Sequence, residues 1–243
     1  MVLYLIMKNI YINPLFYIVA LIMLTTGFFK PFLFMIIYLL LHELGHILVA
    51  YILGYKVKKI SIFPCGLLTI FDIKLNDSIL KNFLIALAGP LFQIISFQII
   101  KKYYFIHIFL LIFNLLPIYP LDGSKIISSI FYILFSYKKT NDILFIISYI
   151  LCIFFITYFT LNFNLIYILI FIVLIIKIIE FYKQRKYIFN TFILERMNYN
   201  FNFISVKKIK SINQLYKSRY HYILENNKYI DEKTYLNKKF NQN

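Results

Sequence analysis

An all-α protein that crosses a membrane several times is the fold class that the sequence predicts. Of its 243 residues, 61% are hydrophobic, which is well above the apolar share of a soluble domain. These residues gather in runs, and a membrane-spanning helix needs about 20 mostly apolar residues. Six runs are long enough: 11–29, 32–53, 79–100, 105–135, 142–160 and 163–181. We expect about six transmembrane helices in a membrane domain over residues 1–182.

The first run is expected to stay in the chain as an anchor. The segment MVLYLIMKNIYINP at its start does not combine a basic end, an apolar core and a small-residue cleavage site. The second and third runs are typical spanning helices. The fourth run is too long for one straight helix, and Pro117 and Pro120 remove backbone donors there, so we expect it to be broken.

The loop after the second run has the composition of a β element. Its sequence, VKKISIFPCGLLTIFDIK at 57–74, is rich in β-branched and aromatic residues, and Pro64 and Gly66 interrupt it. It predicts a small membrane-associated β element or a re-entrant loop. An ordinary cytoplasmic hairpin is the alternative.

Positive charge predicts that both chain ends are cytoplasmic, because cytoplasmic loops retain lysine and arginine. With that topology seven loop lysines lie inside and three outside, and the tail, 183–243, carries 13 Lys and Arg against 4 acids. The anionic lipid surface is the expected partner of this charge, and no nucleic acid is expected. A solvated basic tail without a specific partner is the alternative.

Acidic residues are scarce in the membrane domain, so those at membrane depth are informative. Only six precede residue 183: Glu43, Asp72, Asp77, Asp122, Asp142 and Glu180. Four of them fall in loops or at helix ends that can reach water, which leaves Glu43 and Asp122. An ionisable side chain inside the membrane indicates a functional site when a partner can be named.

The partners of Glu43 are two histidines. In HELGH, at 42–46, His42, His46 and Glu43 fall at roughly 0°, 40° and 100° around a helix. Two imidazoles one turn apart can bind one Zn²⁺, and the glutamate beside them can take a proton from a bound water. Gly45 is expected to turn to the opposite side and to let another helix approach. Histidines hydrogen-bonded across helices are the structural alternative.

A catalytic zinc takes three protein ligands and a water, and Asp122 is the remaining acid at depth. It follows the break made by Pro117 and Pro120, and Gly123 relaxes the backbone after it. Irregular backbone at this depth must be buried in protein or line a wet cavity. We therefore predict Asp122 as the third ligand, with a helix-capping role as the alternative.

Three further polar residues receive weaker interpretations. Asn114, upstream of the break, could bind freed carbonyls or a substrate backbone, and the alternative is a packing amide between helices. His107 and His221 are lone histidines near predicted surfaces, and we interpret both as interfacial or solvated.

These motifs resemble the site-2 protease family of intramembrane zinc metalloproteases. The resemblance rests on HELGH together with NLLPIYPLDG at 114–123, and further segments are similar to its sporulation branch: INPLFYIVA, IFPCG, LAGPLFQ and EFYKQRKYIFNTFILER. The chain departs from the family pattern at two places. Many members have Asn where this chain has Gln93, and many have a Gly-Gly pair where this chain has Cys65-Gly66. The tail resembles about one repeat of the cystathionine-β-synthase type, with the order strand, helix, two short strands and helix.

The resemblance implies an intramembrane zinc metalloendopeptidase. One zinc ion would be held by His42, His46 and Asp122, with Glu43 as the general base. Asn114, Pro117 and Pro120 would contact the substrate, and the loop 57–74 could add a strand to it. The implied substrate is a membrane-associated sigma-factor precursor, and partner membrane proteins would inhibit or regulate the enzyme. The implied location is the mother-cell membrane around the forespore of a sporulating bacterium.

Two other functions would also place His, Glu and Asp at membrane depth. A metal or proton transporter is expected to have paired broken helices in corresponding halves, whereas this sequence has one such break. A catalytically inactive scaffold that uses zinc to brace helices gives no reason for the glutamate beside the ligands.

Overall fold

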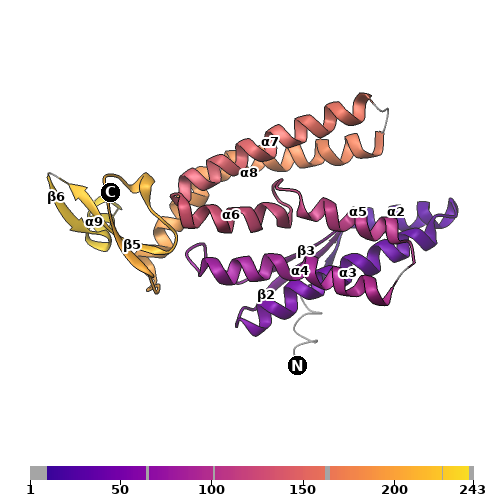
Figure 1. Cartoon of the computed structure of the whole chain (residues 1–243), viewed down its shortest axis with the longest axis horizontal. Coiled ribbons are helices and arrows are strands. Elements are labelled where there is room, and N and C mark those ends of the chain that lie inside the picture. The colour runs from indigo at the N-terminus through magenta and orange to yellow at the C-terminus, as the bar shows by residue number, and fades with distance from the viewer. Residues whose placement is uncertain (1–9, 64–65, 101, 162–164, 226, 241–243) are drawn as a thin grey trace. The chain divides into compact units, whose positions relative to one another are not determined.

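The structure, a computed structural model, describes residues 10–63, 66–100, 102–161, 165–225 and 227–240. The described chain is mostly helical, as predicted (Figure 1). It folds into two compact units, one formed by residues 1–73 and 84–115 and the other by 74–83 and 116–243.

The first unit combines long apolar helices with a small sheet. Its elements are β1 (Ile10–Ile12), α2 (Pro14–Thr25), α3 (Phe29–Ile52), β2 (Val57–Phe63), β3 (Gly66–Phe71), most of α4 (Ile79–Ile99) and α5 (Tyr104–Leu115). β1 pairs parallel to β2, and β2 pairs antiparallel to β3. The loop 57–74 therefore forms β strands, as its composition predicts, and the membrane association of this element stays a prediction. The Pro64–Cys65 part of the loop lies outside the described residues.

The second unit contains the remaining helices and the tail. Its elements are α6 (Asp122–Leu134), α7 (Tyr137–Leu161), α8 (Leu165–Asn198), β4 (Ser205–Ile209), the 3₁₀ turn η1 (Ile212–Gln214), β5 (Arg219–Glu225), β6 (Lys228–Asp231) and α9 (Glu232–Phe240). α7 and α8 lie side by side (Figure 1). β4 is parallel to β5, and β5 is antiparallel to β6. The tail has the predicted order of elements, with a 3₁₀ turn in place of its first helix.

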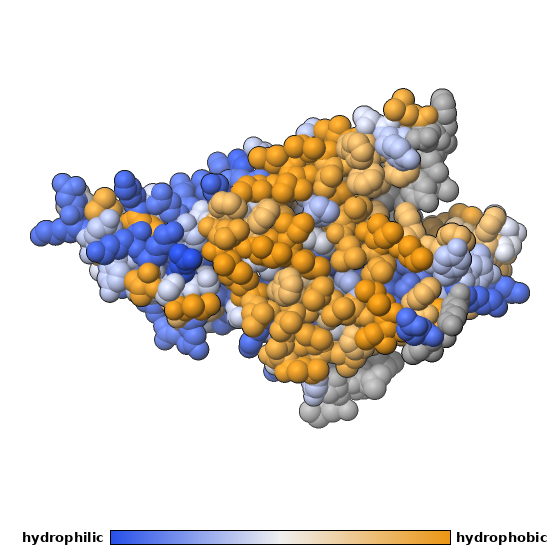
Figure 2. Space-filling model, in the orientation of Figure 1, coloured by the Kyte–Doolittle hydropathy of each residue, from blue (hydrophilic) through white to orange (hydrophobic). Residues whose placement is uncertain are grey.

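Three described helices are long and apolar enough to cross a membrane: Phe29–Ile52, Ile79–Gln98 and Tyr137–Leu161. The face in Figure 2 is largely hydrophobic over the helices and hydrophilic over the tail. α2 has only 12 residues, and the run 105–135 divides into α5 and α6, as its prolines predict. The start of the run 163–181 lies outside the described residues, and the count of six spans stays a prediction.

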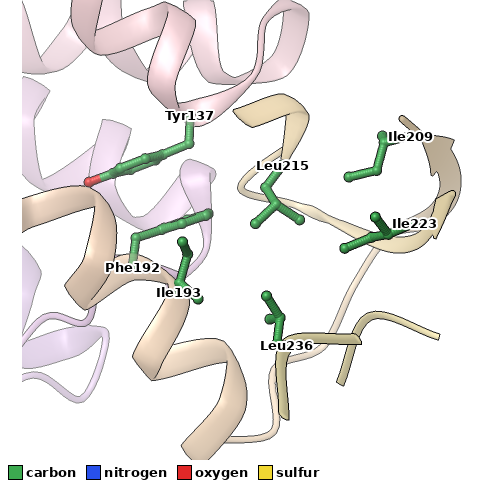
Figure 3. Close-up of a cluster of buried hydrophobic side chains, with 7 residues drawn as sticks. All are labelled: Tyr137, Phe192, Ile193, Ile209, Leu215, Ile223 and Leu236. Atoms are coloured by element: carbon green, nitrogen blue, oxygen red, sulfur yellow. The ribbon is translucent and has the colours of Figure 1, made fainter. Parts of the chain in front are cut away.

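The tail shares a hydrophobic core with α7 and α8 (Figure 3). The core side chains are Tyr137, Phe192, Ile193, Ile209, Leu215, Ile223 and Leu236. The rings of Tyr137 and Phe192 stack with their centroids 3.9 Å apart. The tail is therefore packed on these helices, and the predicted domain boundary at residue 183 falls inside α8.

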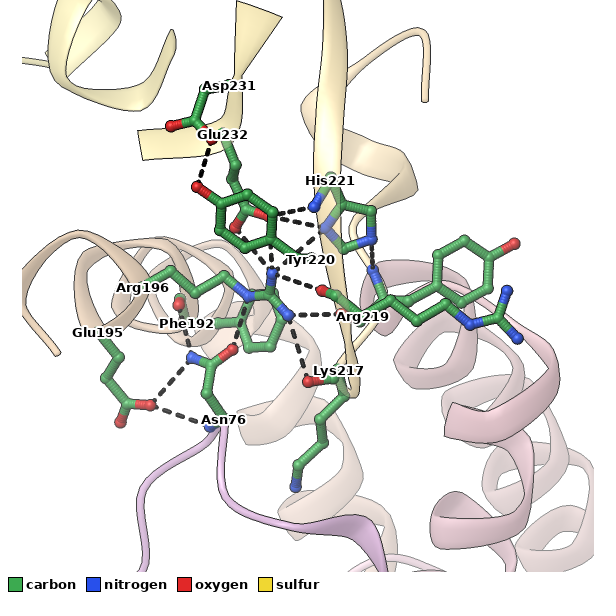
Figure 4. A network of polar contacts seen from close by, with 11 residues as sticks. Asn76, Phe192, Glu195, Arg196, Lys217, Arg219, Tyr220, His221, Asp231 and Glu232 are labelled. Atoms are coloured by element: carbon green, nitrogen blue, oxygen red, sulfur yellow. Dashed lines mark hydrogen bonds and ion pairs between the residues drawn. The ribbon is translucent and has the colours of Figure 1, made fainter. Parts of the chain in front are cut away.

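A buried ion pair ties the end of α8 to the tail (Figure 4). Arg196 Nη1 lies 2.7 Å from Glu232 Oε1, and both side chains are almost fully buried. Glu232 Oε2 also accepts from the backbone N–H and Nδ1 of His221. His221 is thus buried, and its predicted solvated position is wrong. Burial lowers the pKa of His221, which favours the neutral ring.

The same arginine reaches the loop before α4. Arg196 Nε donates to Asn76 Oδ1 at 2.7 Å, and the backbone N–H groups of Leu75 and Asn76 donate to the carboxylate of Glu195. These contacts fix the loop against α8, because buried polar groups need their hydrogen-bond partners.

We expect Glu232→Gln to release the tail. The substitution leaves the Arg196 guanidinium buried without its counter-charge, which costs about 3–5 kcal/mol. Limited proteolysis of the full chain, read through a C-terminal tag, should show faster cleavage in the connection 199–204. Glu180→Gln is the control, because Glu180 forms an exposed pair with Lys177 on the same helix as Arg196. Equal cleavage rates for both variants would contradict the role of the ion pair.

Candidate metal centre

Two histidine side chains of α3 converge on one point in the first unit. His42 and His46 are 3% and 5% exposed, and their Nε2 atoms lie 3.1 Å apart. Two nitrogens on a tetrahedral zinc, each about 2.0–2.1 Å from it, would be about 3.3 Å apart. The predicted pair therefore has the spacing of two zinc ligands.

The outer nitrogens of both rings are held by α4. His46 Nδ1 donates to the carbonyl oxygen of Ile85 at 2.7 Å, and His42 Nδ1 lies 2.9 Å from Gln93 Oε1. A ring that donates from Nδ1 presents the lone pair of Nε2, and a metal-ligating histidine usually has such a partner.

Gly89 of α4 keeps the space beside the two Nε2 atoms open. A Cβ atom at this position would lie 2.7 Å from His42 Nε2 and closer still to His46 Nε2. Real Cβ atoms do not come so close to neighbouring atoms. Only glycine at position 89 therefore allows α4 to lie this close to the two imidazoles. The two imidazoles fit a zinc ion, because histidine nitrogen is one of its usual protein ligands.

Gly45 brings α3 and α4 together on the same side. A Cβ atom at Gly45 would lie 2.5 Å from the carbonyl oxygen of Ala88. The predicted close approach of another helix is confirmed. Gly45 was predicted to face away from the histidines, and this direction is wrong. The helix that approaches Gly45 is α4, which also forms the hydrogen bonds to His42 and His46.

Glu43 contacts the small sheet. The hydroxyl group of Thr69, on β3, donates to Glu43 Oε2 at 2.7 Å. The motif helix and the sheet of loop 57–74 are thereby joined at the residue predicted as the general base. Sequence reasoning did not identify Thr69, because its partner lies 26 positions away.

Asp122 begins α6 in the second unit. Its side chain is buried, and Lys125 Nζ lies 2.8 Å from its Oδ1. The N-cap position is occupied by Leu121, so Asp122 is the first helical residue and not the cap. The predicted break precedes it, and Tyr119 in this break donates its backbone N–H to Ser148 Oγ of α7.

The other predicted residues have mixed outcomes. Asn114 lies near the end of α5, and Pro117 and Pro120 lie in the connection to α6; their contacts with a substrate stay predictions. His107 is 1% exposed, so its predicted interfacial or solvated position is wrong. Its ring and backbone both bond to Gln93 of α4.

Comparisons with known proteins find similar sequences. The model of peptidase family M50 matches residues 31–100 and 96–157. Stage IV sporulation protein FB of Bacillus subtilis is 28% identical over 204 residues, which cover 77% of this chain and 71% of that protein. A zinc metalloprotease of Methanocaldococcus jannaschii is 30% identical over 145 residues, 52% of this chain and 42% of that protein.

A solved structure has a similar fold. The site-2 protease from Methanocaldococcus jannaschii superposes with a TM-score of 0.55 at 24% sequence identity, and the match covers 70% of this chain and 89% of that one.

We expect Gly89→Ala to abolish most zinc binding. The added methyl group would displace both imidazoles, so zinc affinity should fall at least about tenfold, a typical loss when the ligands are misplaced. Zinc content of the purified chain, titrated with a competing chelator, measures the effect. Gly66→Ala is the matched control, because a Cβ atom at Gly66 has nothing within 4 Å. Full zinc affinity in Gly89→Ala would exclude this position of the metal.

Proposed function

This chain belongs to peptidase family M50 and is a zinc metalloprotease of the membrane, and we propose that it cleaves a membrane-associated protein substrate within the bilayer. The observation that carries the proposal is the pair of buried imidazoles whose Nε2 atoms lie 3.1 Å apart in an apolar helix, with Glu43 beside them. Ionisable side chains cost free energy in hydrocarbon, and those that lie at membrane depth usually serve a function.

We propose that His42, His46 and Asp122 hold the zinc ion. Each offers one ligand atom and each is buried, and three protein ligands leave one position for water. When bound, zinc supplies a Lewis acid that polarises a peptide carbonyl and makes water more acidic. Asp122 also brings the negative charge that offsets part of the charge of the ion.

Glu43 is proposed as the general base and acid. Its carboxylate accepts the proton of the attacking water and then delivers it to the leaving amine nitrogen. The hydroxyl of Thr69 holds one carboxylate oxygen, which limits rotation of the side chain. The second oxygen can then face the reacting groups.

The sheet of the first unit is proposed to hold the substrate as an extended strand. A peptide bond in a membrane helix is shielded by its own hydrogen bonds, so the substrate has to unwind before cleavage. Among the described strands, β3 pairs with β2 alone, and its other edge can accept a strand. Asn114, Pro117 and Pro120 are proposed to contact the substrate near the break.

The finer assignments rest on the resemblance to the sporulation branch. The substrate is proposed to be a sigma-factor precursor, and inhibitory membrane proteins are the proposed regulators. The proposed location is the mother-cell membrane around the forespore. The six proposed spans in a membrane domain over 1–182 rest instead on the apolar runs of the sequence. Both chain ends and the tail 183–243 are proposed to be cytoplasmic, in agreement with the positions of lysine and arginine.

We expect Glu43→Gln to stop cleavage without loss of zinc. The amide cannot accept the proton, and removal of a general base costs about 100- to 10,000-fold in rate. Co-expression with a tagged sigma-factor precursor, read on a gel beside bound zinc, measures both effects. Asp122→Asn should lose zinc as well as cleavage. Full cleavage by Glu43→Gln would overturn its role as the base, and zinc binding without any cleavage by the unmodified chain would favour the inactive scaffold.

We expect Thr69→Val to lower kcat about fivefold with KM and zinc content unchanged. One hydrogen bond contributes about 1 kcal/mol, and the loss should affect the step that uses Glu43. Thr69→Ser, which keeps the hydroxyl group, is the matched control and should retain kcat. A rise in KM alone would show instead that Thr69 acts in substrate binding.

A further inference from the structure

We propose that Gln93 is a positioning residue of the zinc site, which fixes the tautomer of His42 and thereby directs His42 Nε2 to the metal. The inference rests on the metal-binding role proposed for His42. Gln93 lies on α4 and is 1% exposed.

The orientation of the Gln93 amide follows from its contact with α5. Its Nε2 lies 3.0 Å from the backbone carbonyl oxygen of His107. A carbonyl oxygen only accepts hydrogen bonds, so the end of the amide that faces it must be the NH₂ group. The opposite end is therefore the side-chain carbonyl oxygen.

This carbonyl oxygen determines which ring nitrogen of neutral His42 carries the hydrogen. Gln93 Oε1 lies 2.9 Å from His42 Nδ1, and two acceptors cannot form a hydrogen bond, so Nδ1 carries the hydrogen. In a neutral imidazole the lone pair then belongs to Nε2. This is the atom that lies 3.1 Å from His46 Nε2.

The clamp between α4 and α5 holds the amide in place. His107 Nε2 donates to the backbone oxygen of Gln93 at 2.8 Å, and Ser96 Oγ donates to the same oxygen at 2.7 Å. The His107 ring also meets the Tyr38 ring of α3 edge to face, with the centroids 4.6 Å apart. Gln93 thus bonds at both ends of its side chain and at its backbone, and a flipped amide would lose its hydrogen bond to the carbonyl oxygen of His107.

The two histidines are set by different kinds of partner. The backbone oxygen of Ile85 accepts the hydrogen bond from His46. A substitution of the Ile85 side chain does not remove this backbone oxygen. The partner of His42 is the side chain of Gln93. A substitution of Gln93 therefore removes this hydrogen bond and leaves the proposed zinc ligand His42 itself unchanged. Loss of such a partner typically lowers metal affinity by about 10- to 100-fold.

The test compares Gln93→Met with Gln98→Met in the purified full-length chain. Gln98 is exposed on the same helix, so the second variant controls for the loss of an amide in α4. Gln93→Glu keeps an acceptor for His42 Nδ1 and, with its buried carboxyl group protonated, a donor to the carbonyl oxygen of His107. Zinc affinity is measured by competition with a chelator, and the absorption spectrum of the Co²⁺-substituted protein reports the ligand geometry. His42→Ala serves as the reference for loss of the ligand.

The expected result is a 10- to 100-fold lower zinc affinity and an altered Co²⁺ spectrum for Gln93→Met. Gln98→Met should match the unmodified chain, and Gln93→Glu should stay within about threefold of it, since the acceptor remains. Unchanged affinity in Gln93→Met, with a loss in His42→Ala, would overturn the role of Gln93 alone. Equal losses in Gln93→Met and Gln93→Glu would overturn it too, because the effect would be packing. Unchanged affinity in His42→Ala would overturn the proposed ligand itself.

Discussion

The close packing of α3 against α4 is the constraint on which the metal centre depends. Two imidazoles in an apolar helix are tolerable only if their outer nitrogens have partners, since an unpaired polar group is costly in hydrocarbon. α4 supplies both partners, Ile85 and Gln93, and it can do so because Gly45 lets its backbone approach α3. The same approach would close the space at the Nε2 atoms if residue 89 carried a side chain. The affinity of the site for a metal therefore depends on the close contact between α3 and α4.

A different physical problem arises in the second unit, the burial of a charged pair. Arg196 and Glu232 are withdrawn from water, and such a pair persists only when its other donors and acceptors are also satisfied. Arg196 also donates to the carbonyl oxygens of Tyr216, Lys217 and Arg219. The guanidinium group of Arg196 also lies 4.9 Å from the ring centroid of Phe192, a residue of the core in Figure 3. The position of the tail is therefore specified by directional bonds as well as by hydrophobic contact.

The sequence predicts features whose evidence is local. Three local patterns predict structure: the spacing of His42 and His46 within one helical turn, the prolines before Asp122, and the β-branched residues of the loop after α3. The structure contains the corresponding helix, break and strands. Gln93, Gly89 and Thr69 were missed as parts of the site because their partners lie far along the chain. The segment LAGPLFQ carried a signal, a glycine within an apolar helix, but its partner could not be named. His107 and His221 were misplaced for the same reason: a single histidine in a sequence does not reveal the carbonyl or carboxylate that makes its burial acceptable.

The shared core of α7, α8 and the tail also determines how the chain can be shortened. A stop codon after α8 would remove Leu215, Ile223 and Leu236 from the core and Glu232 from Arg196, and would expose Tyr137 and Phe192 to water. The truncated protein would carry an uncompensated cation and an apolar surface where the full chain has neither. Loss of activity in such a deletion would therefore report misfolding of α7 and α8. Single substitutions on the outer face of the tail sheet, such as at Val206 or Tyr229, which are 62% and 45% exposed, leave that core intact and can test the tail surface separately from folding.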